Sequence, residues 1–348
     1  MDRVRRGIAS VVPVLVIAAC GGNTAIELDA QPACEPACGA HATCEGATCV
    51  CEDGYIGDGL ACREVWTMVA SLAFDIAPSS YEPAVVVHRE SIFVGIETNT
   101  AGVGAWRAID VSAVPRLGPA LTLPPVEQND FCFCGATQTL VSDGQDAIYM
   151  LGNHAQRYDV SANRWVEIPG YTVPADLRRA EAASVFDPAG PWILTFGGRG
   201  PTDEVLRFAP GDGTFVVDAS TLPASISDAA AWLPPAGDAI FVAGGRGQLD
   251  APQNHILSRP TGAGAWVVHP EVDGDITAPI GMGDFRQRIW VASANGRAYF
   301  YDPATSTWDP TIDLPADTRA VVTAGGATWA LSRTAGGVLD LYRLSNID

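Results

Sequence analysis

The chain has 348 residues, and its 21 Lys and Arg against 40 Asp and Glu give a formal charge of −19. So acidic a chain argues against nucleic acid and anionic lipid as partners. Gly and Pro are frequent, with 36 and 25 residues. Many short apolar runs separated by turn signals, without long helical periodicity, predict an all-β architecture.

Residues 1–19 have the pattern of a secretory signal peptide. Three arginines precede an apolar run over 8–19, which is too short for a membrane span because that takes about 20 residues. The run ends in Ala18-Ala19-Cys20-Gly21. This ending resembles the lipobox of bacterial lipoproteins, in which the cysteine receives lipid. An ordinary signal peptide with an unrelated cysteine is the alternative.

Residues 20–33 show no apolar periodicity, and we expect them to form a flexible lipidated tether. The lipobox resemblance implies lipid at Cys20 and a lipid-anchored protein of the bacterial cell envelope. Gly21 stands where well-studied lipoproteins of the inner membrane carry a retaining Asp. The resemblance therefore favours the outer membrane.

Six cysteines crowd into residues 34–62, a segment too short to bury a core of its own. They are Cys34, Cys38, Cys44, Cys49, Cys51 and Cys62. Disulfides must replace the core, and six cysteines allow 15 pairings. The spacing, above all CVCEDGYIGDG over 49–59, resembles an EGF-like domain. The resemblance implies the pairs Cys34–Cys44, Cys38–Cys49 and Cys51–Cys62. We interpret the module as a stapled spacer, with a specific recognition role as the alternative.

Residues 64–348 repeat with a period of about 47 residues. Each repeat has an apolar strand ending in small residues, as in 193–198 and 240–245. An outer-strand position follows in five repeats, at Leu117, Trp165, Phe215, Trp266 and Trp308. The last repeat ends before this position, and Trp66 at the other end of the domain supplies the missing member.

A repeat of about 40 to 50 residues with four strands predicts a β-propeller. An N-terminal strand holding Trp66 is expected to complete the last blade and remove the open edge. The double glycines, the Tyr-Asp pairs and the tryptophans that follow resemble Kelch repeats. The resemblance implies a six-bladed Kelch-like β-propeller over 64–348. The innermost strands are predicted at the small or β-branched runs 84–87, 136–139, 182–185 and 229–231.

In a four-stranded blade, the loop entering the innermost strand and the loop after the second strand lie on the same face, where binding residues are expected. The entering loops each hold one acid, at Glu82, Asp130, Glu181, Asp228, Asp275 and Asp317. Two interpretations are open. A ring of carboxylates would attract cations or basic groups and hold Ca²⁺ through oxygen ligands. Alternatively, the acids only form turns through their own hydrogen bonds.

The loops after the second strand supply the other predicted ligand contacts. These are Asn153, His154, Arg199, Arg246, Asn295 and Arg333. In Kelch domains, side chains after the double glycine contact the partner. The resemblance therefore points to Arg199 and Arg246, each within Gly-Gly-Arg-Gly. Such an arginine would pair bidentately with a ligand carboxylate or, alternatively, with an acid of a neighbouring loop.

The remaining two cysteines, Cys132 and Cys134, fall in the loop that enters the second blade. We expect them to form a disulfide with each other in an oxidising compartment. Metal binding with His154 and free thiols are the alternatives.

The sequence favours a binding or adhesion lipoprotein that recognises a protein or a glycan, and it identifies no cofactor. The alternative is a secreted propeller enzyme, either a hydrolase or one like the copper radical oxidases, which share the Kelch-type fold and need two histidine ligands near the axis. The histidines His88, His154, His255 and His269 are scattered, and none is placed on an innermost strand. No paired base or nucleophile is visible, so we predict no enzyme activity.

Overall fold

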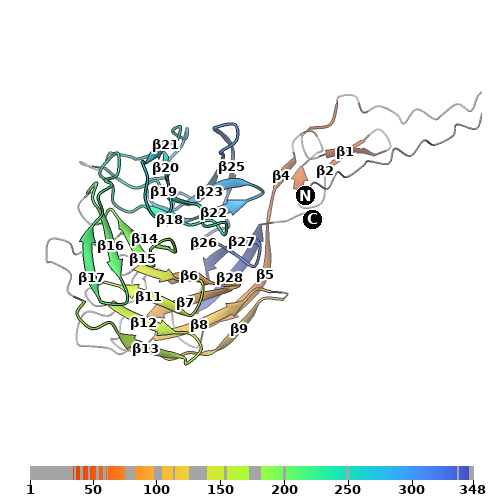
Figure 1. The fold of residues 1–348 in the computed structure, drawn as a ribbon. Coiled ribbons are helices and arrows are strands. Elements are labelled where there is room, and N and C mark those ends of the chain that lie inside the picture. The colour runs from red at the N-terminus through yellow and green to blue at the C-terminus, as the bar shows by residue number, and fades with distance from the viewer. Residues whose placement is uncertain are drawn as a thin grey trace, which may run out of the picture.

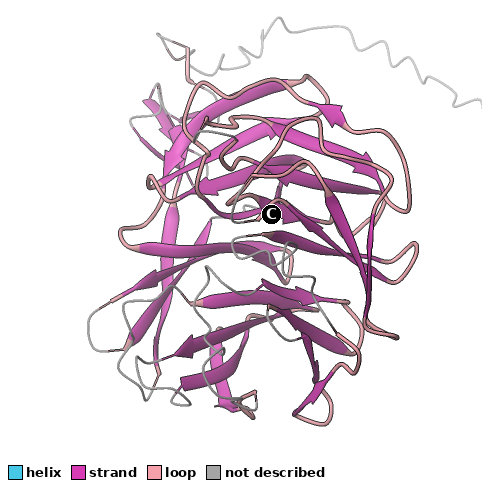
Figure 2. Cartoon of the chain, turned by 90° about the vertical axis from the view of Figure 1, so that its left-hand side faces the viewer, coloured by secondary structure: helices cyan, strands magenta, loops and turns pink. Residues whose placement is uncertain are grey.

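The computed structural model describes residues 34, 37–39, 42–45, 48–51, 55–57, 60, 62–74, 83–97, 104–112, 114–124, 139–152, 155–171, 182–198, 201–247, 251–334 and 337–344. All the regular secondary structure in these residues consists of β-strands (Figure 2). The strands form six four-stranded antiparallel sheets and two small two-stranded sheets. The predicted six-bladed propeller is therefore confirmed. None of the described segments is a helix of the length and apolar character that crosses a membrane.

The first three blades follow chain order from the innermost to the outermost strand. Blade one holds β6 (Ala84–His88), β7 (Ser91–Glu97), β8 (Gly104–Asp110) and β9 (Arg116–Ala120). Blade two holds β10 (Thr139–Ser142), β11 (Ala147–Leu151), β12 (Ala155–Asp159) and β13 (Arg164–Glu167). Blade three holds β14 (Ala183–Asp187), β15 (Trp192–Phe196), β16 (Val205–Ala209) and β17 (Thr214–Val217).

The last three blades repeat this order, except that blade six takes its outermost strand from the N-terminal side. Blade four holds β18 (Ala230–Trp232), β19 (Ala239–Ala243), β20 (Ile256–Pro260) and β21 (Val267–Val268). Blade five holds β22 (Pro279–Phe285), β23 (Arg288–Ser293), β24 (Arg297–Asp302) and β25 (Thr307–Asp313). Blade six holds β26 (Thr318–Ala324), β27 (Ala327–Arg333), β28 (Val338–Leu344) and β5 (Trp66–Ala73).

The innermost strands close a ring around the propeller axis. β6, β10, β14, β18, β22 and β26 contact one another in this order, and β26 contacts β6 again. The blades accordingly follow one another around the ring in chain order (Figure 1). Blade six is closed as predicted, because β5 pairs antiparallel with β28 from Trp66 opposite Leu344 to Ala73 opposite Val338.

Each pair of neighbouring blades shares one buried apolar cluster. Between blades one and two, Trp106 and Tyr158 meet edge to face with ring centroids 5.8 Å apart, and both side chains are fully buried. The other five interfaces have equivalent clusters. Burial of one large apolar side chain contributes about 1.5–3 kcal/mol. The stability of the ring therefore depends on contacts between blades, since a single twisted sheet cannot cover both of its own faces.

The Tyr-Asp pairs of the repeat end the third strand and start the turn to the fourth. Asp159 accepts hydrogen bonds from Ser161 Oγ and Ala162 N, at 2.9 and 3.1 Å. Asp302 likewise accepts a hydrogen bond from Ala304 N, at 2.8 Å. These backbone and side-chain bonds lower the pKa of both aspartates. The aspartate of each Tyr-Asp pair therefore has a structural role, because its side chain accepts the hydrogen bonds that form the turn.

The predicted innermost strands are found with small shifts. β6 matches the expected run 84–87, while β14 and β18 each begin one residue later than expected. β10 begins at Thr139, the last residue of the run 136–139, whose other residues lie outside the described part of the chain.

The segment before the propeller forms two short hairpins, β1 (Ala42–Glu45) with β2 (Thr48–Cys51), and β3 (Tyr55–Gly57) with β4 (Cys62–Glu64). Its disulfides are Cys34–Cys44, Cys38–Cys49 and Cys51–Cys62. These are the three pairs that the EGF-like resemblance implies. β4 is followed after one residue by β5, so the module continues directly into the outermost strand of blade six (Figure 1).

Candidate functional site

The two ends of the ring differ in the length of their loops. Because neighbouring strands are antiparallel, the connections between blades and those from second to third strands lie at one end, which we call the candidate face. The connections between blades are residues 74–83, 121–138, 168–182, 218–229, 269–278 and 314–317. The opposite end, the hairpin face, carries the first-to-second connections 89–90, 143–146, 188–191, 233–238, 286–287 and 325–326. Long loops on a rigid scaffold commonly carry binding residues, whereas tight turns mainly reverse the chain.

The first glycine of each double glycine packs against the backbone of the next blade. Gly197 has φ +66°, and a Cβ there would lie 2.5 Å from Ile226 O. Gly244 has φ +67°, and a Cβ there would lie 2.0 Å from Ile276 O. Only glycine tolerates both the left-handed backbone and the close approach. The double glycine therefore joins the loop of one blade to the entering loop of the next.

Arg246 combines a fixed backbone with an exposed side chain. Its N–H donates to Ser227 O at 2.9 Å, and its carbonyl accepts the N–H of Ser227 at 2.7 Å. The carboxylate of Asp275, on the loop entering the next blade, lies within electrostatic reach. Hydrogen bonds from the side chain and backbone of Thr277 lower the pKa of Asp275, and the positive charge of Arg246 lowers it further. The charge of Arg246 therefore acts on an acid of a neighbouring loop, and both sequence interpretations of Arg246 stay predictions.

Asn295 connects two loops of blade five. Its Nδ2 donates to Asp275 O at 2.8 Å and to Tyr299 Oη at 2.9 Å. Its Oδ1 accepts the N–H of Arg297 at 3.0 Å. The tyrosine hydroxyl also accepts the N–H of Asp275 at 3.2 Å. The amide of Asn295 is therefore engaged within the protein, although the residue is exposed.

Asp228 and Asp317 both have a left-handed backbone, with φ of 52° and 55°. Asp228 Oδ2 accepts a hydrogen bond from Ser227 Oγ at 3.2 Å. The carboxylate of Asp317 faces Arg319, whose Nη2 lies 4.0 Å from Oδ1. Aspartate is among the residues that adopt this conformation most readily.

The three described acids do not occupy equivalent places in their blades. The first pair of opposed residues between the innermost and second strands gives a common reference for the three blades. It is Ala230 opposite Ala243 in blade four, Pro279 opposite Ser293 in blade five and Thr318 opposite Ser332 in blade six. Asp228 lies two residues before the innermost-strand member of this pair, Asp275 four residues before it and Asp317 one residue before it. Regular spacing in the sequence therefore does not place these carboxylates on one regular ring.

Among the described residues, the carboxylate oxygens of Asp228, Asp275 and Asp317 do not all lie within 4.8 Å of one another, so the three do not form a metal-binding group. The three other acids of the predicted ring, Glu82, Asp130 and Glu181, lie outside the described residues. Ca²⁺ at this ring therefore stays a prediction.

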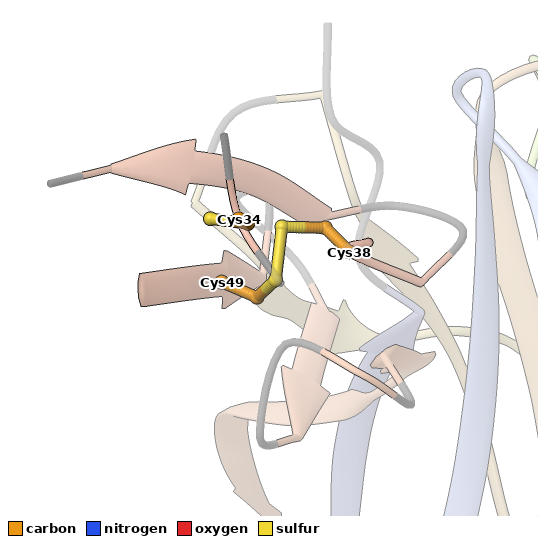
Figure 3. A group of neighbouring side chains, drawn as sticks. All are labelled: Cys34, Cys38 and Cys49. Atoms are coloured by element: carbon orange, nitrogen blue, oxygen red, sulfur yellow. A yellow bond between two sulfur atoms is a disulfide. The ribbon is translucent and has the colours of Figure 1, made fainter. Parts of the chain in front are cut away.

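One group of metal-ligand type is found among the described residues, formed by Cys34, Cys38 and Cys49 in the N-terminal module (Figure 3). Cys34 is bonded to Cys44, and Cys38 to Cys49. A metal needs thiolates, and these sulfurs are already in disulfides. The three sulfurs therefore lie close together because two disulfides pass next to each other.

Several predicted residues fall outside the described part of the chain. They are Cys20, Cys132, Cys134, Asn153, His154 and Arg199. Lipid attachment, the bond between the two loop cysteines and the ligand contacts of the other three residues remain predictions.

Sequence reasoning missed Arg319, which lies in the innermost strand of blade six at the candidate face. Its side chain is 37% exposed and is paired loosely with Asp317. Together with Arg246 and Arg333, it places positive charge among the acids of this face. A long charged residue in a run otherwise made of small and β-branched residues, TRAVVTA over 318–324, is the signal that could have identified it.

The statement that no histidine lies on an innermost strand was wrong, because His88 ends β6. The sequence run 84–87 stopped one residue short of it. The side chain of His88 is only 3% exposed, and its Nδ1 lies 2.9 Å from Ser142 Oγ in blade two. Since β6 runs from the candidate face to the hairpin face, His88 lies at the end opposite to the predicted ligand contacts. It joins two blades at their innermost strands.

Comparison with known proteins supports the fold alone. No protein-family model matches the chain, and no curated protein matches its sequence. Among solved structures, the propeller is similar to the structure of YjhT, with a TM-score of 0.57 and 11% sequence identity. The similarity covers 79% of this chain and 97% of YjhT. At this identity the match shows a shared β-propeller fold.

Proposed function

We propose that the protein is an extracytoplasmic, membrane-anchored binding protein that recognises a protein or a glycan through the candidate face. The observation that carries the proposal is the asymmetry of the ring. Among the described residues, the connections between blades on the candidate face include 218–229 and 269–278, whereas the longest first-to-second connection on the hairpin face is 233–238. A folded scaffold that concentrates its long loops at one end is typical of a binding module.

The path of the chain also supports the candidate face as the binding surface. β5 begins at Trp66 opposite Leu344, the last residue of β28, and this end of blade six belongs to the hairpin face. Everything N-terminal to β5, including the disulfide module and the proposed lipid at Cys20, therefore joins the ring at the end away from the candidate face. An anchored molecule would present its long loops away from the anchor.

The chemistry of the candidate face fits a polar ligand. Arg246 lies beside Asp275, and Arg319 lies beside Asp317, so both signs of charge alternate among the described residues. Arginine offers bidentate hydrogen bonds to carboxylates, and aspartate accepts from hydroxyls and cations. A ligand with several hydrogen-bonding groups is better matched to this surface than a simple cation.

The compartment is proposed from the three disulfides, because such bonds persist outside the reducing cytoplasm. The lipobox resemblance adds the envelope and, through Gly21, the outer membrane. The Kelch class of the repeats is likewise part of the proposal and rests on the double glycines and the outer aromatic positions.

The proposal is tested by screening the purified full chain against arrays of glycans and envelope proteins. We expect binding that is lost or weakened at least tenfold in a variant combining Arg246→Ala and Asp275→Asn. The matched control is Arg116→Ala with Asp110→Asn, a residue pair opposite each other on the hairpin face. A ligand bound equally well by the candidate-face variant, or lost only in the control, would contradict the assignment of the face.

A further inference from the structure

A cluster of two arginines and one aspartate, of which Arg259 and Asp218 are buried, lies between blades three and four. Arg207 of β16 donates from Nη2 to Asp218 Oδ2 at 2.6 Å. Arg259 of β20 reaches across from blade four, and its Nη1 lies 3.5 Å from Asp218 Oδ1. The side chain of Arg259 is 0% exposed and that of Asp218 is 4% exposed. The pair of Arg259 and Asp218 is therefore shielded from water, whereas the side chain of Arg207 is 28% exposed.

The carboxylate of Asp218 accepts hydrogen bonds on both of its oxygens. Besides the two arginines, its Oδ1 accepts hydrogen bonds from Ser220 N at 2.8 Å and from Ser220 Oγ at 2.7 Å. Burial by itself raises the pKa of Asp218, but the bonds from Ser220 and Arg207 and the charge of Arg259 outweigh burial and lower the pKa to about 2. Asp218 is therefore ionised at neutral pH and already bonded to Ser220 and both arginines.

The guanidinium of Arg259 uses only one of its nitrogens for these contacts. Nη1 bonds to Asp218 and to Ser220 Oγ. Nε and Nη2 are buried, and no acceptor from the described residues lies within hydrogen-bond distance of either. These two nitrogens form one edge of the planar group, with two parallel N–H bonds, which is the edge that holds an oxyanion or a halide.

Two other N–H donors at this interface are also buried without an acceptor among the described residues. Trp266, whose ring lies under the Arg259 guanidinium at 5.3 Å, has a buried Nε1 without an acceptor in the described part of the chain. Arg207, stacked at 5.2 Å over Trp192, has a buried Nε in the same state. All the side-chain polar atoms left without a partner here are N–H donors. Because only donors are left unsatisfied at this interface, the matching ligand is an anion, which only accepts hydrogen bonds.

The nearby carboxylate of Asp187 does not meet this need. It is 1% exposed and accepts hydrogen bonds from Ala189 N at 3.0 Å and from Gly262 N at 2.9 Å. Neither arginine of the cluster forms an ion pair with it in the described structure. Buried N–H groups without an acceptor are unfavourable, so an acceptor at the Nε and Nη2 edge of Arg259 is expected.

We propose that the Nε and Nη2 edge of Arg259 binds a small monovalent anion of the chloride class between blades three and four. The nitrogens are closed to solvent, which favours a single small ion over a metabolite or a ligand carboxylate. The anion accepts from the unsatisfied donors and holds the two blades together. The proposal does not depend on the proposed function.

Bromide replaces chloride and is visible by anomalous diffraction, which gives the direct test. Crystals of the full chain grown in sodium bromide should show an anomalous peak in contact with Arg259 Nε and Nη2. Absence of a peak there, with an ordered water in its place, would overturn the proposal. This measurement uses the unaltered protein and does not depend on whether a variant folds.

The second test follows thermal unfolding in sodium chloride and in sodium methanesulfonate at the same ionic strength. A ligand that binds only the folded state raises the midpoint, and we expect it to be higher in chloride by about 2–5 °C. Arg259→Met should abolish the difference. Arg288→Met is the matched control, because Arg288 also stacks on an aromatic ring, Phe300, and pairs with one carboxylate, Asp309, at 3.0 Å. Equal midpoints in the two salts for the unaltered chain, or a difference that survives Arg259→Met, would refute an anion at this edge.

Discussion

Trp66 pairs with Leu344, so the first residue of β5 lies opposite the last residue of β28 although the two residues are separated by nearly the whole propeller sequence. The pairing continues to Ala73 opposite Val338. Buried side chains of both strands, including Leu72 and Leu341, join the apolar cluster between blades six and one. The ring is thus closed by hydrogen bonds within one blade rather than by a contact between two blades.

A disulfide across this closure should stabilise the ring. Ala73 and Val338 are directly opposite each other, so Ala73→Cys combined with Val338→Cys places two cysteines at paired positions. A cross-link that closes so long a loop restricts the unfolded chain, and we expect the oxidised form to be about 2–4 kcal/mol more stable than the reduced form. Denaturation in urea under both conditions measures this difference. Ala73→Cys alone is the control and should show no dependence on oxidation at this site.

Two of the four outer tryptophans donate a hydrogen bond to the connection from the preceding blade. Trp165 Nε1 donates to Thr122 O, and Trp308 Nε1 donates to Pro270 O, both at 2.9 Å. Trp165→Phe removes the donor, and we expect a loss of about 1 kcal/mol in the free energy of unfolding beyond the effect of the smaller ring. Trp66→Phe is the matched control, since Trp66 Nε1 has no acceptor among the described residues. A control that loses as much stability as Trp165→Phe would show that the hydrogen bond contributes nothing.

The double glycine is required by contact as well as by backbone conformation, and two glycines separate these effects. Gly237 has φ +68°, and a Cβ there would meet nothing within 4 Å, whereas Gly244 has φ +67° and a Cβ there would meet Ile276 O. Gly237→Ala should cost about 1–2 kcal/mol, the strain of a left-handed residue. Gly244→Ala should cost at least about 2 kcal/mol more, because the backbone of blade five must move. Urea unfolding of both variants gives the comparison, and equal losses would mean that the contact is easily relieved.

The fold could be predicted because its signals are imposed by geometry that recurs in every blade. Gly197 and Gly244 repeat because the chain approaches the next blade closely at the same point. Trp66 could be assigned to the last blade because the other five repeats each supply their own outer residue. These requirements leave periodic marks in the sequence.

The candidate site could be predicted only in part, because side chains on loops obey no period. Asp275 was aligned with Asp228 and Asp317 by spacing, yet the strand pairing places the three at different positions before the innermost strand. Arg259 gave no signal at all, since one arginine inside a strand looks like a surface residue until the neighbouring blade covers it. Burial between blades is a property of the assembled ring.

Acid should weaken the contact between blades one and two through His88. Burial is the main reason that the pKa of His88 lies below its ordinary value of 6.5; Asp143 and Asp146 oppose the shift, and Arg89 adds to it. The unfolded chain therefore binds a proton before the folded chain does. The stabilisation is complete above pH 6.5 and is lost progressively as the pH falls from 6.5 toward the lowered pKa of the folded state.

His255 and His269 also have lowered pKa values through burial, so they add to the same dependence. His88→Asn should reduce the slope of the unfolding free energy against pH between about 7 and 5 without abolishing it. Ser142→Ala is the control, because it removes the hydrogen-bond partner of His88 but leaves the titrating ring in place. Urea unfolding at several pH values measures the slopes. A slope in His88→Asn equal to that of the unaltered chain would mean that His88 takes up its proton equally in both states, as an imidazole open to water would.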